Sequence, residues 1–253
     1  MVDEKLLKSA ISRISSWTVP DSQEPILCRG FYTVLMVWPL AFLASPILLN
    51  FFKQSMSSDL YTGLAMLIPQ LVLGIAVIGV MVVDGDIINT LNLGRWRWRY
   101  LAIGAGSAIP ILFLNGGISQ LWLELCDYLG FQLPNETALE IIIKNAGTGL
   151  FITSALMAVI LAPIVEEVVF RRVIFSFASM RQGIPVAFFL TSAVFALIHL
   201  DLKNLPGLFV LGMAFQTITL LCRSLYPAVI MHSTNNIIAV TIIYAIKKGW
   251  IEI

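Results

Sequence analysis

Long apolar blocks, rather than the stripes of a soluble helix or strand, dominate this chain. A helix that crosses a membrane needs about 20 mostly apolar residues, within a range of about 17 to 25. The region 117–147 is instead amphipathic and acidic, and it leaves room for an eighth short or re-entrant segment. The pattern therefore predicts an all-α, polytopic membrane bundle of seven to eight spans. The seven predicted spans are 31–52, 60–83, 99–116, 148–172, 184–200, 206–222 and 226–246.

The N-terminal stretch has a different pattern. Apolar residues at helical spacing alternate with lysines and an arginine over residues 4–17, which predicts an amphipathic helix lying in the membrane interface. We divide the chain accordingly into an interfacial segment (1–30), N-terminal membrane helices (31–147), a catalytic helical core (148–246) and a short tail (247–253).

Composition narrows the class of protein further. Hydrophobic residues make up 58% of the 253 positions and charged residues 12%, about half the usual share in soluble domains. These values exclude a soluble globular enzyme, a disordered chain and a nucleic-acid binder with a basic face. The formal net charge is +1, so lipids rather than nucleic acids are the expected surroundings. Three widely spaced cysteines without a CxxC pair suggest neither a disulfide framework nor a thiolate metal site.

Basic residues are distributed unequally between the two sides of the predicted bundle. With seven spans, eleven lysines and arginines fall on the N-terminal side and five on the other side. Positive charge accumulates on the cytoplasmic side of membrane proteins, so a cytoplasmic N-terminus in a multi-pass plasma-membrane protein is expected.

Ionisable residues inside predicted spans are few, and each one is a functional hypothesis because burying it in lipid costs free energy. Glu166 and Glu167 interrupt an apolar run. Glu167 and Arg171 are four residues apart, which places them on one helix face as an ion pair. Glu166 points about 100° away, with no basic partner, and suits a general base. The alternative is that both glutamates simply end a helix, while Arg171 and Arg172 extend toward lipid headgroups.

The only two histidines of the chain, His199 and His232, also fall in predicted spans. Helices 148–181 and 184–200 are joined by a short turn, and Glu166 and His199 lie equally far from its middle, so they reach the same depth. His232 and Asn236 share a face on another span and could donate hydrogen bonds to an oxyanion. Together these residues indicate hydrolysis of an acyl or amide bond. A helix cap at His199 and interhelical hydrogen bonding by His232, Asn235 and Asn236 are the structural alternatives.

Three short motifs at these positions resemble the CAAX prenyl protease and bacteriocin-processing (Abi) family. They are EExxxR from Glu166 to Arg171, FxxxH from Phe195 to His199, and HxxxN from His232 to Asn236. The resemblance covers about 148–246 and implies a helical intramembrane bundle of about eight spans. It also implies that Glu166 and His199 activate a water molecule. By the same likeness, His232 and Asn236 form the oxyanion hole, while Glu167 and Arg171 order the first motif.

The family's eukaryotic members remove the last three residues of prenylated CAAX proteins, and its bacterial members are linked to peptide maturation and bacteriocin self-immunity. This short chain is more similar to a prokaryotic member. The resemblance implies no metal or other cofactor, and it implies a peptide or a lipidated protein as substrate.

Two further functions remain open from the sequence. One is a zinc protease that uses His199, His232 and a glutamate, although the chain has no HExxH motif. The other is a non-catalytic immunity or peptide-binding protein that uses the same polar pocket.

Overall fold

The computed structural model describes residues 4–83, 91, 96–134 and 146–251, and within these ranges every regular element is helical. The first half contains α1 (Glu4–Ser15), α2 (Glu24–Asn50), α3 (Ser58–Val83) and α5 (Arg99–Tyr128), with short 3₁₀ turns at Asp21–Gln23 and Lys53–Ser55. The second half contains α7 (Thr148–Leu156), η3 (Met157–Leu161), α8 (Ala162–Glu167), η4 (Val168–Ile174), α9 (Phe175–Gln182), α10 (Ile184–Ile198), α11 (Leu205–Cys222) and α12 (Tyr226–Lys247).

Six helical segments of the described chain are long and apolar enough to cross a membrane, and α10, with 15 residues, is a shorter apolar helix. The predicted polytopic bundle is therefore confirmed. Several predicted span boundaries differ from the helix ends. The span predicted to begin at 31 belongs to a helix that begins at Glu24, and the span predicted to end at 116 continues to Tyr128. The apolar span predicted to end at 172 continues to Gln182, which agrees to within one residue with the helix 148–181 expected from the turn, and the span predicted to reach 200 ends at Ile198. Residues 117–128 thus extend a long helix, and 135–145 lie outside the described residues.

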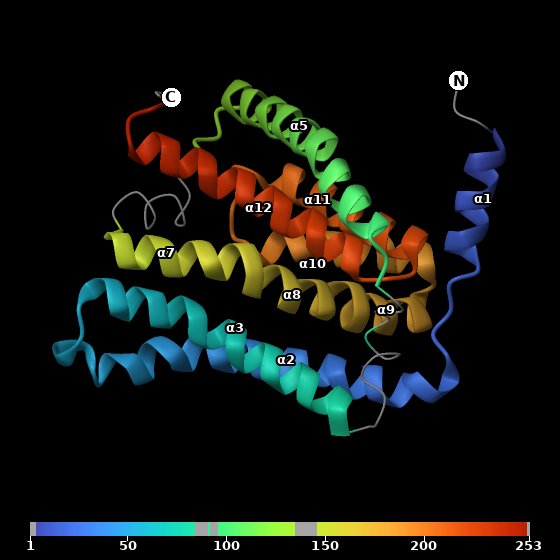
Figure 1. Ribbon diagram of the computed structural model, residues 1–253, viewed down its shortest axis with the longest axis horizontal. Coiled ribbons are helices and arrows are strands. Elements are labelled where there is room, and N and C mark those ends of the chain that lie inside the picture. Colours follow the sequence, from blue (N-terminus) through green and yellow to red (C-terminus); the bar gives the residue numbers. More distant parts are fainter. Residues whose placement is uncertain (1–3, 84–90, 92–95, 135–145, 252–253) are drawn as a thin grey trace.

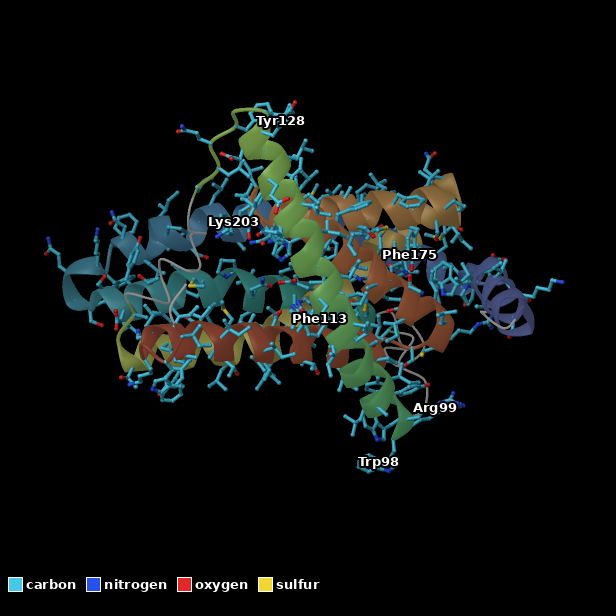
Figure 2. The ribbon with its side chains drawn as sticks, turned by 90° about the horizontal axis from the view of Figure 1, so that it is seen from above. Trp98, Arg99, Phe113, Tyr128, Phe175 and Lys203 are labelled. Carbon is cyan, nitrogen blue, oxygen red and sulfur yellow. The ribbon has the colours of Figure 1, made fainter. Side chains whose placement is uncertain are left out.

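The α7–α9 run occupies the middle of the bundle (Figure 1). It packs against α2 and α3 on one side and against α10 and α12 on the other. Helix α5 crosses obliquely over α11 and α12, as Figure 2 shows from above. The two chain ends lie at opposite ends of the bundle. Most residues of α8 therefore meet other helices, and Ile164 is the exposed exception.

Close backbone approaches fix how these helices sit against one another. A Cβ atom added to Gly74 on α3 would lie 2.9 Å from Cγ2 of Val165 on α8. Similarly, a Cβ atom on Gly104 of α5 would lie 2.7 Å from Ile230 on α12. The α9–α10 turn uses Gly183 at φ 79°, a backbone conformation that favours glycine, and Pro185 in the first turn of α10.

Two π-helical segments, η3 and η4, flank the six residues of α8 that include both glutamates. A π-helical turn inserts extra residues into an α-helix, and such turns are frequent at functional sites. They rotate the side chains of α8 relative to those of α7 and α9. Regular α-helical spacing therefore does not relate the faces of α7, α8 and α9 to one another across these two segments.

Helix α1 lies across one end of the bundle (Figure 1). Beyond its last turn, the Trp17 ring meets Phe175 edge-on, with 5.0 Å between centroids, and Ile14 joins the same apolar cluster. The predicted helix is present, and its place at the lipid interface stays a prediction.

Candidate active site

Glu167 is the centre of a buried polar network at the end of α8. Its side chain is fully buried, and Oε2 lies 3.1 Å from Nε of Arg171. The other oxygen, Oε1, lies 2.9 Å from Nδ1 of His232 on α12. The ion pair predicted from the four-residue spacing is present. Its carboxylate also holds a histidine, which the sequence did not predict.

The Arg171 guanidinium is enclosed by aromatic rings. Its central carbon lies 4.6 Å from the ring centroid of Phe195, 5.2 Å from Phe215 and 5.7 Å from Phe170. Arg171 and Arg172 are both buried, so neither extends toward lipid headgroups. Arg172 instead donates hydrogen bonds to Ser176 and to Gln23. The alternative in which these arginines merely anchor a helix end in the interface is wrong.

The His232 ring is oriented by a stacking contact and by a hydrogen bond. Phe215 stacks on the imidazole with 4.6 Å between centroids, and the Glu167 carboxylate accepts a hydrogen bond from Nδ1–H. An ionised carboxylate can only accept, so Nδ1 donates this bond, and Nε2 is the ring nitrogen left for another partner. Nε2 lies 4.0 Å from Oε2 of Glu166. The imidazole is thus held with its second nitrogen toward the other glutamate.

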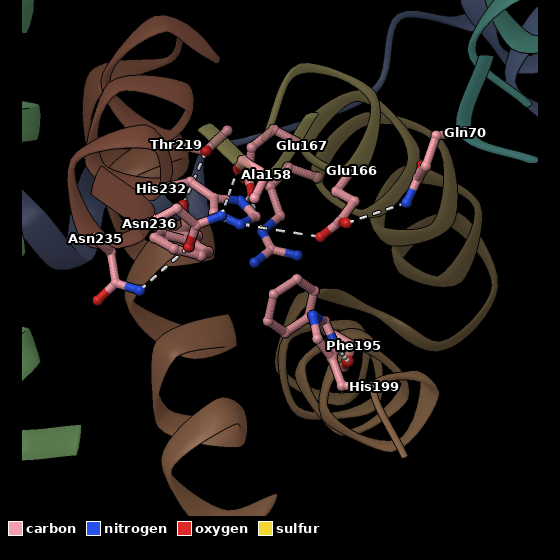
Figure 3. A network of polar contacts seen from close by, with 12 residues as sticks. Gln70, Ala158, Glu166, Glu167, Phe195, His199, Thr219, His232, Asn235 and Asn236 are labelled. Carbon is pink, nitrogen blue, oxygen red and sulfur yellow. Dashed lines mark hydrogen bonds and ion pairs between the residues drawn. The ribbon is translucent and has the colours of Figure 1, made fainter. Parts of the chain in front are cut away.

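The sequence predicted that Glu166 has no basic partner. In the structure it has an amide partner that the sequence did not predict. Nε2 of Gln70, on α3, donates to Oε1 of Glu166 at 3.4 Å (Figure 3). The second carboxylate oxygen, Oε2, is buried and makes no hydrogen bond within the described residues. The side chain as a whole is 13% exposed. One oxygen is therefore held by Gln70, and the other is buried without a hydrogen-bond partner in the described residues.

His199 lies at the C-terminal end of α10 rather than within a span, and its side chain is exposed. Nδ1 lies 2.6 Å from the carbonyl oxygen of Phe195, and the two rings have centroids 4.7 Å apart. The Phe195 ring therefore packs against the imidazole one helical turn away. Among the described contacts, none joins His199 to Glu166, and the imidazole nearest to that carboxylate is His232 (Figure 3).

The two asparagines of α12 behave differently from one another. Nδ2 of Asn236 donates to the carbonyl oxygen of Ala158 in η3 at 2.7 Å. Asn235 donates only to Asn236, at 3.4 Å, and its buried Oδ1 has no hydrogen-bond partner in the described chain. The interhelical bond expected of Asn235 is therefore made by Asn236. Asn236 keeps a second N–H, which its bond to Ala158 leaves unused.

Sequence reasoning missed Gln70. The stretch 60–83 is apolar throughout apart from Tyr61, Thr62 and this amide, and a lone amide in such a stretch is the signal that could have identified it. The stacking of Phe215 on His232 was also missed. No pattern in α11 distinguishes Phe215 from its apolar neighbours.

A cavity of about 440 Å³ lies between α3 and α7, away from the glutamates. It runs from Ser57 and Asp59 at the start of α3 to Met66 and Leu67, one turn before Gln70. Its walls are largely apolar.

The arrangement of possible ligand side chains bears on whether the site holds a metal ion. Within the described residues, no group of three His, Cys, Asp or Glu side chains is arranged to hold a metal ion. Glu166, Glu167 and His232 lie close together, but Glu167 is already used by Arg171 and His232.

Comparison with known proteins shows what the helices that carry this site are similar to. Residues 148–238 match the model of the family described as "Type II CAAX prenyl endopeptidase Rce1-like". The match contains all seven residues singled out by the motifs, so the predicted resemblance is confirmed for this part of the chain.

The chain is also 34% identical over 116 residues to the membrane-embedded CAAX protease MroQ of Staphylococcus aureus (strain USA300). The alignment covers 43% of this chain and 45% of that protein, so less than half of either is compared. No solved structure matches the chain.

Proposed function

We propose that this protein is a membrane-embedded endopeptidase that hydrolyses a peptide bond with water activated by Glu166. The observation that carries the proposal is the free Oε2 of Glu166, buried and 4.0 Å from Nε2 of an oriented His232. That separation exceeds a direct hydrogen bond and is short enough for one water molecule to contact both atoms once the site opens to substrate. The family match over 148–238 supports the same reaction class.

The reaction balances with these groups. The water oxygen attacks the peptide carbonyl carbon while its proton passes to Glu166, and the carbonyl oxygen becomes an oxyanion. Collapse of this intermediate breaks the C–N bond, and the proton on Glu166 passes to the departing amine. Asn236, His232 and His199 are proposed to contact water or oxyanion once a substrate is bound, since apo geometry is often looser than that of the complex.

Substrate and topology belong to the same proposal. We expect a peptide or a lipidated protein as substrate, and a plasma-membrane protein whose N-terminus faces the cytoplasm. The printed name of the relative, a CAAX protease, supports the substrate class. The basic asymmetry of the sequence supports the orientation.

The test compares cells carrying the wild type with cells carrying Glu166→Gln. Gln keeps the shape and accepts the hydrogen bond from Gln70, but it cannot take a proton. Turnover should therefore fall by roughly 10²- to 10⁴-fold. Proteomics of membrane peptides should show an uncleaved peptide that accumulates only with the variant. A fluorescence-quenched version of that peptide then provides an assay for purified protein in detergent. A folded Glu166→Gln protein with wild-type turnover would disprove the proposal.

A zinc protease is the second candidate, because two histidines and a glutamate form a known catalytic set. A strong chelator distinguishes the two. Water activation by Glu166 alone predicts unchanged activity after chelation. Activity that disappears with chelation and returns with added zinc would establish the metal mechanism instead.

Biological function without cleavage would point to the third candidate, an immunity or peptide-binding protein. Glu166→Gln would then keep full function in cells, although it removes the proposed base.

A further inference from the structure

From the contacts of α3 we infer that Gln70 is a positioning residue of the proposed reaction, and that it fixes the Glu166 carboxylate so that Oε2 faces the substrate. The inference rests on the proposed role of Glu166. It assigns a part of the active site to the N-terminal half of the chain, outside the family match over 148–238.

The hydrogen bond itself is directional. Nε2 of Gln70 donates to Oε1 of Glu166 at 3.4 Å, and a carboxylate can accept only from the NH₂ end of the amide. Because Oε1 is engaged, rotation of the carboxylate about its last bond is restricted, and Oε2 stays on the side of His232. Figure 3 shows Gln70 and His232 approaching Glu166 from opposite sides.

Packing next to this bond fixes its geometry. Gly74 lies one helical turn after Gln70, and Val165 directly precedes Glu166. A Cβ atom at Gly74 would be 2.9 Å from Val165. The backbone of α3 at Gly74 therefore lies directly against the Val165 side chain of α8, beside the Gln70–Glu166 pair. Pro69 is buried directly before Gln70, which places this part of α3 inside the bundle.

Stability does not explain this glutamine. Its Oε1 is buried with no hydrogen-bond partner in the described residues. Leaving this buried oxygen unsatisfied carries a desolvation cost, which offsets what the bond to the carboxylate contributes to stability. An apolar side chain at this position would pack without that cost. The amide is therefore explained by what its donor does for Glu166.

The test replaces Gln70 with Met, which keeps the length and volume but removes the donor. The fluorogenic peptide described above is the probe. A misplaced reacting group lowers rates by up to about 10²-fold, so kcat should fall 10- to 100-fold while KM stays within about two-fold. The melting temperature in detergent should stay at or above that of the wild type.

Gln120→Met is the matched control. It removes the same kind of bond, from Nε2 of Gln120 to Oε1 of Glu124 at 3.1 Å, on an exposed face of α5. It should leave both kcat and KM unchanged.

A second variant covers the case in which Gln70→Met does not fold. Gln70→Glu keeps the shape of the amide but places a second carboxylate against Glu166, and it should lower kcat as well. The inference is wrong if a folded Gln70 variant keeps the wild-type kcat while Glu166→Gln is inactive. Equal changes in kcat, KM and melting temperature would also overturn it, since they indicate a merely structural role. If Glu166→Gln is itself active, the proposed function fails instead.

Discussion

Two interactions converge on the carboxylate of Glu167, and both are buried. It pairs with Arg171 and accepts a hydrogen bond from Nδ1 of His232. Glu167→Gln keeps an oxygen for the histidine but leaves the Arg171 charge without its counter-ion. Breaking a buried pair in this way typically costs about 3–5 kcal/mol. We expect a clearly lower melting temperature in detergent together with residual turnover.

Glu166→Gln is the comparison for this variant, because it should show the reverse result, with stability kept and turnover lost. Full stability of Glu167→Gln would mean that the pair with Arg171 contributes nothing to the fold.

The asparagines on α12 allow a second comparison between neighbours. Asn236→Ala removes the bond to Ala158 and the unused N–H that we assign to the oxyanion. If Asn236 is an oxyanion donor, the expected loss is about 2.7–4 kcal/mol of transition-state stabilisation, or 10²- to 10³-fold in kcat. Asn235→Ala should cost much less, because Asn235 bonds only to Asn236 among the described residues. Equal losses in kcat from two folded variants would remove the oxyanion assignment.

Much at the residue scale was readable from the sequence, and the remainder has a physical cause. The Glu167–Arg171 pair follows from helical spacing alone. The contact between Glu167 and His232 joins residues 65 positions apart, and no spacing rule reaches that far. Their equal distance from the turn predicted that Glu166 and His199 lie at the same depth in the membrane. Depth does not fix rotation, and the two π-helical segments change the rotation of α8.

Among the helices, the contact between α3 and α8 determines how the N-terminal half completes the site. Gly74→Ala inserts a methyl group 2.9 Å from Cγ2 of Val165, so either the Val165 side chain or α3 itself must shift. Overpacking of this kind costs about 1–3 kcal/mol. It should also lengthen the Gln70–Glu166 bond and lower kcat. Activity with the fluorogenic peptide and melting in detergent measure the two effects.

Gly79→Ala is the control on the same helix, because nothing lies within 4 Å of its added Cβ. It should fall within about 1 kcal/mol of wild type, on the stabilising side, since alanine favours a helix over glycine. A Gly74→Ala protein that matches Gly79→Ala in both assays would show that the close approach has no consequence.

The helix boundaries show the limits of hydropathy at the same scale. The apolar run ended at 172, ten residues before the end of the α7–α9 run, whereas the turn before residue 184 placed the helix end at 181, within one residue of Gln182. Arg171 and Arg172 look like the end of a span in the sequence. In the structure both are buried, Arg171 among aromatic rings and Arg172 beside Ser176 and Gln23, so the helix continues to Gln182.

For the molecule as a whole, the distribution of basic residues predicts its orientation in the membrane. Eleven basic residues fall on the N-terminal side and five on the other. Arg171 and Arg172 are buried inside the bundle, which leaves nine against five. Positive residues near the ends of spans still favour a cytoplasmic N-terminus. The α9–α10 turn lies at the same end of the bundle as α1, so it should also face the cytoplasm (Figure 1).

Cysteine labelling tests this orientation in a chain whose Cys28, Cys126 and Cys222 have first been replaced by alanine. Gln182 and Gln54 are both exposed and lie at opposite ends of the bundle, in α9 and in the turn between α2 and α3. A membrane-impermeant maleimide should label Gln54→Cys in intact cells and Gln182→Cys only after permeabilisation. Labelling of Gln182→Cys from outside would reverse the orientation. A substrate would then reach the exposed His199 from the opposite side of the membrane.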